Sequence, residues 1–447
     1  MVAFLHTLEY DLKNINKEGN NNMNIFLKDT NNNGLSNEII KEALIRSIKQ
    51  FELENNKIIK KVLLLPPDFT RFYSNAGYIT NTYYNILKDT VEVDVMPALG
   101  THRAMTKEEC LEMYKDIPYE KLFYHNWHTD IVKIGEVPAD FIKDITEGLW
   151  DEKVDVEVNK LIMDRSYDLI ISIGQVVPHE VIGMANHSKN IFVGCGGKEM
   201  INCSHMIGAV YGMERMMGKD HTPVRKIFDY SLGHFLKDIP LLFALTVTTF
   251  NKKVLTHGLF IGEKRNTLEE AIKLSQEKNI DFVDKGIKKC IVYLEPKEFQ
   301  STWLGNKAIY RTRMAIADDG ELIVLAPGVK KFGEDLSIDK IIRKYGYIGR
   351  LNVLGKFKDN SDLRENMGAA AHLIHGSSDG RFKITYAVKN ISREEIESVN
   401  FSSASYDELI QKYPIDKLKY GWNIINNEEI FYIPNPALGL WIDKTRF

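Results

Sequence analysis

The sequence predicts an α/β protein with two α/β domains, whose mainly parallel sheets flank a cleft. Three observations support this prediction. Short apolar runs alternate along the chain with segments of helical periodicity, which is typical of parallel βαβ units. Each apolar run ends in polar, glycine-rich or proline-rich residues, which indicates a buried strand followed by a loop. The alternation starts again after about residue 255, and 447 residues are enough to form two hydrophobic cores.

The N-terminal half contains four candidate strands and three candidate helices. Residues 12–35 are rich in Asn, Lys and Gly and are expected to form a surface loop or hairpin. The expected strands are 60–65, 91–95, 167–177 and 190–197. The expected helices are 36–58, 77–90 and 106–116. The carboxyl ends of parallel strands meet at one edge of a sheet, and ligands bind there.

The C-terminal half repeats the same alternation. The expected strands are 288–295, 320–328 and 382–388. The expected helices are 267–279, 302–317, 334–346 and 363–374. We therefore divide the chain into an N-terminal α/β domain (1–255), a C-terminal α/β domain (256–420) and a terminal segment (421–447). The terminal segment is apolar and aromatic, so it is expected to pack back onto the N-terminal domain.

The composition excludes several classes of protein. With 58 Lys and Arg against 61 Asp and Glu, the chain lacks the basic excess of a nucleic-acid-binding protein. Its four cysteines form no C-x-x-C pair and are too few for a disulfide scaffold, which indicates a reducing compartment. The N-terminus lacks the features of a signal peptide, and the apolar runs are too short to span a bilayer. We expect a cytoplasmic protein with no nucleic-acid or membrane partner.

Polar side chains follow three of the expected strands. Asp68, Thr70 and Arg71 follow the first strand, and a guanidinium of this kind can bind a carboxylate through two parallel hydrogen bonds. His102 follows the second strand and His179 the third. Imidazole titrates near neutral pH and suits acid–base catalysis. Two plainer interpretations stay open at this point: Asp68 and Arg71 pair to cap a helix, and the histidines are structural.

The segment from 179 to 205 is dense in reactive groups, but it matches no common cofactor motif. No set of His, Cys or Glu residues at the i, i+3 or i+4 spacing of zinc ligands stands out. The glycines of G-C-G-G-K (194–198) suit a phosphate at a helix N-terminus. Their spacing, however, is neither that of a P-loop nor that of a dinucleotide-binding fingerprint. An ordinary NAD-dependent oxidoreductase is therefore disfavoured.

Taken in order, these motifs resemble the nickel-dependent lactate racemase family. The order is D-x-T-R, then G-T-H-R, then P-H, which ends at His179. Lys189 follows His179 by ten residues, and His205 follows Lys189 by sixteen. The residues between Lys189 and His205 keep the form of the family without a gap. The resemblance covers roughly residues 60–330.

The resemblance implies two α/β domains around a cofactor cleft that holds a nickel-pincer nucleotide. This cofactor is a modified pyridinium nucleotide whose nickel is held by carbon and sulfur arms. By resemblance, Lys189 forms a thioamide to the cofactor and His205 supplies the fourth nickel ligand, while Lys198 is the alternative anchor. Asp68 and Thr70 are expected to contact the cofactor. Other proteins synthesise the cofactor, so transient contacts with cofactor-synthesis proteins are expected.

The implied reaction inverts C2 of a 2-hydroxy acid, so the chain is expected to be an isomerase. Removing the α-proton beside a carboxylate is hard, whereas oxidation to a 2-keto acid makes C2 planar and lets a hydride return to either face. The cofactor provides the electrophilic hydride acceptor. His102 and His179 are expected to act as acids and bases on the hydroxyl proton. Arg71 and Lys307 resemble the residues that anchor the substrate carboxylate.

Two departures from the family pattern favour a substrate other than lactate. The family's Y-Q-x-x-K is W-L-G-N-K here, so Leu304 replaces a glutamine that contacts substrate. Asn186 and His187 add polar groups beside the anchor lysine, although they could instead bond their own loop. We expect Asn186, His187 and Trp303 to bind a sugar acid, which predicts a D-gluconate/D-mannonate 2-epimerase. The alternatives are a racemase of lactate or another short 2-hydroxy acid, and a cofactor-free protein that binds sugar acids.

Overall fold

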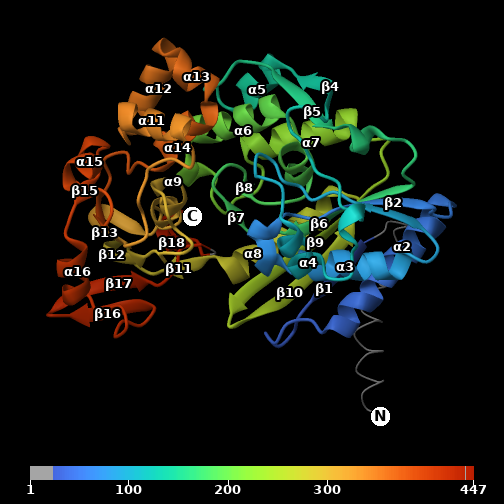
Figure 1. Cartoon of the computed structure of the whole chain (residues 1–447), viewed down its shortest axis with the longest axis horizontal. Helices are drawn as coiled ribbons and strands as arrows, with labels where there is room; N and C mark the ends of the chain where they lie inside the picture. The colour runs from blue at the N-terminus through green and yellow to red at the C-terminus, as the bar shows by residue number, and fades with distance from the viewer. Residues whose placement is uncertain (1–23, 438) are drawn as a thin grey trace.

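The computed structural model describes residues 24–437 and 439–447 (Figure 1). The first part of the expected Asn-rich loop, residues 12–23, therefore lies outside the described residues. Two six-stranded, mainly parallel sheets organise the described chain. This arrangement confirms the predicted α/β class. No helix within the described ranges is both long and apolar enough to cross a membrane.

The first sheet has the strand order β1–β10–β9–β6–β2–β3. Its strands are β1 (Asn24–Lys28), β2 (Lys61–Leu65), β3 (Glu92–Val95), β6 (Leu169–Gln175), β9 (Leu241–Asn251) and β10 (Lys253–Gly262). The neighbours from β9 to β3 are parallel, whereas β10 and β1 add an antiparallel edge. β2, β3 and β6 lie at the first three predicted strands. The β9–β10 hairpin was not predicted, and it extends the first sheet past residue 255.

Both faces of the first sheet are buried. In β2, Val62 and Leu64 pack into one hydrophobic cluster, whereas Leu63 and Leu65 pack into another on the opposite face. Successive side chains of a strand point to opposite faces, so a continuous apolar run forms a central strand with helices on both sides. One face carries α2 (Asn37–Asn55), α3 (Ala76–Leu87) and α4 (Lys107–Tyr114). The other carries α5 (Ala139–Ile145), α6 (Lys198–Tyr211), α7 (Pro223–Phe235) and α8 (Arg265–Asn279).

Two short hairpins lie beside the first sheet. One consists of β4 (Ile131–Val137) and β5 (Val154–Asn159), and the other of β7 (Pro178–His179) and β8 (Gly183–Met184). The predicted strand at 190–197 is wrong, because Asn190–Gly194 form a π-helical turn that leads into α6. Residues 190–194 are all buried there. A short apolar run cannot distinguish a buried strand from a buried helical turn.

The second sheet has the strand order β15–β14–β13–β12–β17–β16, and only β16 is antiparallel to its neighbour. Its strands are β12 (Ile287–Tyr293), β13 (Ile316–Ala326), β14 (Lys383–Val388), β15 (Ser402–Ser403), β16 (Gly421–Ile425) and β17 (Glu428–Ile433). The helices of this half are α9 (Thr302–Gly305), α10 (Lys307–Tyr310), α11 (Leu336–Tyr345), α12 (Arg350–Asp359), α13 (Ser361–Glu365), α14 (Met367–His375), α15 (Arg393–Ser398) and α16 (Tyr406–Lys412).

The predicted helix at 302–317 is shorter than expected. It consists of α9 and α10, and the chain enters β13 at Ile316. Asn306 separates the two helices, and its buried side chain bonds to Tyr386 and His372. The site residues of this half therefore lie on two short helices after the carboxyl end of β12.

The terminal segment contacts both halves of the chain. Residues 421–433 add β16 and β17 to the second sheet. β18 (Trp441–Asp443) pairs with β11 (Asp281–Val283), and Leu440 and Ile442 pack against Met213 and Met217 of the N-terminal half. One large hydrophobic cluster also spans both sheets, from Leu63 to Ile433.

Candidate functional site

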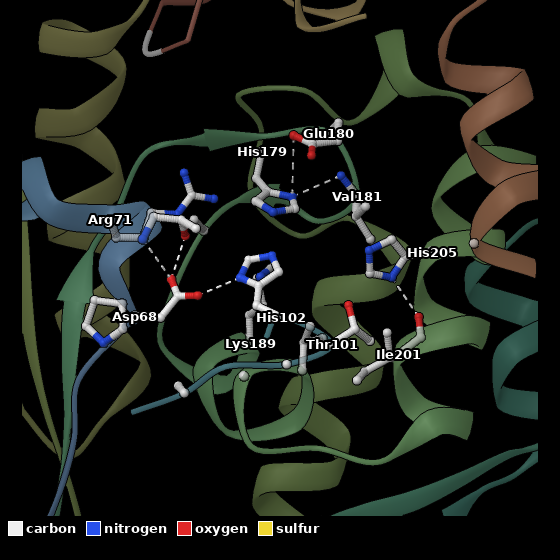
Figure 2. Close-up of a pocket in the computed structure, with 18 of the residues that line it drawn as sticks. Asp68, Arg71, Thr101, His102, His179, Glu180, Val181, Lys189, Ile201 and His205 are labelled. Atoms are coloured by element: carbon white, nitrogen blue, oxygen red, sulfur yellow. Dashed lines mark hydrogen bonds and ion pairs between the residues drawn. The ribbon is translucent and has the colours of Figure 1, made fainter. Parts of the chain in front are cut away.

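A cavity of about 400 Å³ lies at the carboxyl ends of β2, β3 and β6 (Figure 2). Residues from α6, α10 and α14 complete its wall. Its lining includes most of the predicted site residues: Asp68, Thr70, Arg71, His102, His179, Asn186, Lys189, His205, Trp303 and Lys307. The loops that follow three parallel strands thus meet the C-terminal half in one place.

Asp68 begins the turn after β2 and also bonds His102. Its Oδ1 accepts hydrogen bonds from the Thr70 backbone N–H (3.2 Å) and from the Thr70 hydroxyl (2.5 Å). The helix-capping interpretation is therefore correct for Asp68, which caps the 3₁₀ turn Phe69–Ser74, but Asp68 and Arg71 form no ion pair within the described residues. Its Oδ2 lies 2.6 Å from Nδ1 of His102. Figure 2 marks this contact with a dashed line. Sequence reasoning missed this pair, although the two residues follow neighbouring parallel strands.

The pairing fixes which nitrogen of His102 can take up a proton. Burial alone would raise the pKa of Asp68, but the hydrogen bond from His102 and the charges around it lower that pKa below its usual value. An ionised carboxylate only accepts hydrogen bonds, so Nδ1 of His102 carries the hydrogen and Nε2 keeps its lone pair. The side chain of His102 is 56% exposed. His102 is therefore set up as an accessible base that Asp68 orients.

A turn at Gly100 holds the His102 loop in place. Gly100 has a φ of +56°, and its N–H donates to the carbonyl oxygen of Gly194 at 2.8 Å. Glycine adopts positive φ without the steric cost that a side chain would add. This bond ties the loop after β3 to the π-helical turn that follows Lys189.

His179 has the opposite hydrogen-bonding pattern to His102. Its Nδ1 accepts a hydrogen bond from the backbone N–H of Val181 at 3.1 Å (Figure 2). Burial lowers the pKa of His179 well below its usual value, although neighbouring Glu180 opposes that effect. The ring is therefore neutral, and because Nδ1 is an acceptor, its hydrogen is on Nε2. His179 is arranged as a hydrogen-bond donor and not as a base.

Lys189 places a half-buried amine in the same cavity. It directly precedes the π-helical turn, and among the described residues its ammonium forms no hydrogen bond. Burial, reinforced by the charge of Arg71, lowers its pKa from 10.5 to about 8. An amine with a lowered pKa is a better nucleophile at neutral pH. Lys198, the alternative anchor, is an exposed residue at the start of α6 and does not line the cavity.

His205 lies one turn into α6 from Ile201. Its Nδ1 donates to the carbonyl oxygen of Ile201 at 2.7 Å (Figure 2). Nε2 therefore keeps its lone pair. A hydrogen bond of this kind from the second ring nitrogen is typical of histidines that bind metals. Burial lowers the pKa of His205, which favours the neutral form that a metal requires.

Positively charged side chains line the remaining part of the cavity. Arg71 comes from the turn after β2, and Lys307 from the start of α10. Burial, together with the charges of Arg71 and Arg311, lowers the pKa of Lys307 to about 8. Sequence reasoning missed two charged lining residues, Arg311 and Glu180. Arg311 is four residues after Lys307, a helical spacing that could have revealed it.

Comparisons with known proteins agree with this geometry. Residues 10–217 match the family profile described as the lactate racemase N-terminal domain. This stretch of the chain is similar to the N-terminal domain of lactate racemases. The match includes every predicted site residue except Trp303 and Lys307, and it confirms the family resemblance over this stretch. The aldonate branch stays a prediction.

Two solved structures share the fold beyond the stretch that matches the family profile. A Thermotoga maritima protein from a structural genomics consortium is 24% identical, with a TM-score of 0.77 over 94% of this chain and 100% of that one. The lactate racemase apoprotein from Thermoanaerobacterium thermosaccharolyticum is 15% identical, with a TM-score of 0.67 over 90% of this chain and 92% of that one. No curated protein matches the chain.

One predicted substrate residue within the matched stretch, His187, lies outside the cavity. It has a positive φ of 57°, which turns it into the core, and its ring stacks on Phe243 at 3.8 Å. Its neighbour Asn186 does line the cavity, but the Oδ1 of Asn186 accepts a hydrogen bond from the His187 backbone N–H. The alternative that these side chains bond their own loop is therefore right for Asn186, whereas the ring nitrogens of His187 form no hydrogen bond within the described residues.

Arg225, on α7, holds the loop that precedes Lys189. It is buried, and its guanidinium donates to the carbonyl oxygens of Met184 (2.7 Å) and Asn186 (3.2 Å) and to the hydroxyl of Ser188 (2.8 Å). These bonds satisfy backbone groups that the left-handed turn leaves without a strand or helix partner.

Arg225→Met is expected to destabilise the protein by about 2–4 kcal/mol, because the carbonyl oxygen of Met184 and the hydroxyl of Ser188 lose a buried donor and the carbonyl oxygen of Asn186 keeps only the Lys189 N–H. Urea unfolding of the protein without cofactor measures the change. The matched control is Lys226→Met, an exposed neighbour on the same helix, which should shift stability by less than about 0.5 kcal/mol. Equal effects of the two substitutions would contradict a supporting role for Arg225.

The described residues do not form a metal site from side chains alone. Across 24–437 and 439–447, no group of three or more His, Cys, Asp or Glu side chains is arranged to hold a metal ion. The zinc site considered from sequence is thus not formed by these residues.

Proposed function

We propose that this chain is a racemase or epimerase that inverts C2 of a 2-hydroxy acid with a nickel-pincer nucleotide. The main support is the cavity, where the half-buried amine of Lys189, which forms no hydrogen bond within the described residues, and His205, which keeps the lone pair of its Nε2, meet two further histidines. The family-profile match that includes these residues gives independent support. A cofactor-free binder of sugar acids has no need for such an amine and imidazole.

The residues of the cavity suit the proposed cofactor. Lys189 would hold it covalently, and His205 would offer Nε2 to its nickel. When bound, the nucleotide supplies the acceptor for the hydride on C2. Asp68 and Thr70 were assigned to the cofactor from sequence. Both oxygens of Asp68 are already engaged, by Thr70 and His102, so we assign Asp68 to the orientation of His102 instead.

The other side chains would bind the substrate and manage its hydroxyl proton. Arg71 and Lys307 would bind the carboxylate, because their charges face the cavity from opposite halves of the chain. A buried cation binds a carboxylate strongly, since few water molecules compete for it. His102 and His179 would contact the substrate hydroxyl. Closure of the cavity around these groups excludes water from the reacting atoms.

A sugar acid is the proposed substrate, and D-gluconate/D-mannonate 2-epimerisation the proposed reaction. Trp303 and Leu304 line the wall where the family has a glutamine, and Asn186 adds an amide. The second candidate is a racemase of lactate or another short 2-hydroxy acid, because the carboxylate and hydroxyl contacts serve any 2-hydroxy acid. We also propose that the protein works in the cytoplasm and receives its cofactor from the synthesis proteins. Its four cysteines are free thiols, which agrees with that location.

Production of the chain together with the cofactor-synthesis enzymes tests the proposal. The protein should gain the mass of the cofactor and bind nickel, and it should interconvert D-gluconate and D-mannonate. Conversion should be at least about 10²-fold faster by kcat/KM than that of lactate, because a site that bonds hydroxyls rejects a substrate that lacks them. Equal or faster turnover of lactate would favour the second candidate. Absence of activity on both acids in nickel-loaded protein would refute the proposed function.

A further inference from the structure

Two histidines on α14, His372 and His375, line the cavity, and neither has a role in the proposed reaction. They are three residues apart, so they lie on the same side of the helix. Both are almost fully buried, with exposed fractions of 7% and 5%. Burial lowers the pKa of each to about 3, so both rings are neutral at physiological pH.

A buried network fixes the orientation of His372. The Oδ1 of Asn306 accepts from the Tyr386 hydroxyl at 2.7 Å, so Nδ2 of Asn306 is the atom that donates to Nε2 of His372 at 3.3 Å. The Tyr347 hydroxyl lies 3.1 Å from the same nitrogen. With Nε2 as an acceptor, the hydrogen of the neutral ring is on Nδ1. Nδ1 forms no hydrogen bond with any residue in the described ranges.

The ring of Trp303 fixes the position of His372 relative to the substrate side of the cavity. The two ring centroids are 4.2 Å apart. Trp303 begins the W-L-G-N-K motif that ends at Lys307, the proposed carboxylate anchor. His372 therefore lines the cavity beside the residues that replace the family's glutamine.

His375 has no partner within the protein. Its Nε2 is completely buried and forms no hydrogen bond within residues 24–437 and 439–447. Leaving a buried polar atom unpaired costs about 1–3 kcal/mol, so such atoms are rare in folded proteins. A polar ligand in the cavity would offset that cost.

We propose that His372 and His375 form a subsite that hydrogen-bonds the hydroxyl groups of the substrate beyond C2, with Trp303 as its apolar wall. The subsite fits a polyhydroxylated acid and leaves a short acid without polar partners there. The two histidines of this subsite would provide the polar contacts that we expected from His187 on the basis of the sequence. The predicted effect of these histidines on kcat/KM rests on the proposed function, whereas the predicted binding of hydroxyl groups does not.

His375→Phe is the test variant, because it keeps a ring and removes the nitrogens. We expect kcat/KM for D-gluconate to fall about 10- to 100-fold and that for lactate to change less than about threefold. Thermal stability should stay the same or rise, because an unpaired buried nitrogen is lost. The matched control is His187→Phe, since both ring nitrogens of His187 are also buried and unpaired but lie outside the cavity. That variant should leave the ratio of the two kcat/KM values unchanged.

Two results with the active enzyme would overturn the proposed subsite. Equal losses with D-gluconate and lactate would place His375 at the reacting centre. Loss of the cofactor mass from His375→Phe would place it against the cofactor. If nickel-loaded wild type turns over neither acid, the proposed function fails, and calorimetry with D-gluconate then tests the subsite alone. Binding by wild type that weakens at least about tenfold in His375→Phe supports the subsite, and equal affinities or no binding by wild type refute it.

Discussion

His102→Gln is expected to lower kcat by about 10²- to 10⁴-fold, whereas His179→Gln stays within about tenfold of wild type. The difference follows from the two tautomers. Nδ1 of His102 donates to Asp68, so its Nε2 offers a lone pair. Nδ1 of His179 accepts from the Val181 N–H, so its Nε2 carries the hydrogen and can donate it. A glutamine amide can replace a donor, but it cannot take up a proton.

Racemisation by nickel-loaded protein, normalised to nickel content, measures both variants. His179→Leu is the control for the donor, and it should lose about 10²- to 10³-fold because no N–H remains to bond the substrate oxygen. Similar losses in His102→Gln and His179→Gln would show that both histidines act as bases. The tautomer assignment would then apply only to the protein without substrate.

Lys189→Met is expected to abolish cofactor attachment and reduce turnover to background. Methionine fills much the same space but has no amine to form a bond with the cofactor. Intact-mass analysis after production with the synthesis enzymes measures attachment. The matched control, Lys198→Met, should gain the full cofactor mass, because Lys198 is exposed and lies outside the cavity. Added mass on Lys198 of the wild-type protein would overturn the assignment of the anchor.

Lys189→Met should have a higher free energy of unfolding than wild type when no cofactor is present. Because folding lowers the pKa of Lys189 from 10.5 to about 8, the unfolded chain holds more protons between these values, and wild-type stability rises with pH in that range. Below pH 8 the buried charge costs up to about 3 kcal/mol. Lys189→Met removes this cost, so its gain in urea unfolding should be largest near pH 7 and shrink towards pH 10. A gain that is independent of pH would contradict the lowered pKa.

Several features of the site were predictable because they depend on chain order. The loops after β2, β3 and β6 carry Arg71, His102 and His179, and parallel strands bring such loops to one edge of a sheet. The spacing from His179 through Lys189 to His205 follows the family motif, so these residues could be matched without knowledge of their contacts.

Other features depend on contacts that no local pattern encodes. His187 is next to Asn186 in sequence, but a left-handed backbone turn directs it into the core and out of the cavity. The pairing of Asp68 with His102 and the tautomer of His179 depend on single hydrogen bonds across loops. His372 and His375 lie in a helix that looks ordinary in sequence, and only the packing of α14 against α6 brings them to the cavity.

A hydrogen bond from Arg311 to Pro178 links the two halves of the chain at the cavity. Arg311 directly follows α10 in the second half, and its guanidinium donates at 2.9 Å to the carbonyl oxygen of Pro178, the residue just before His179. The bond therefore couples the position of α10 to the β7 strand that carries His179. A displacement of α10 that broke this bond would also remove one of the contacts that hold His179 in place.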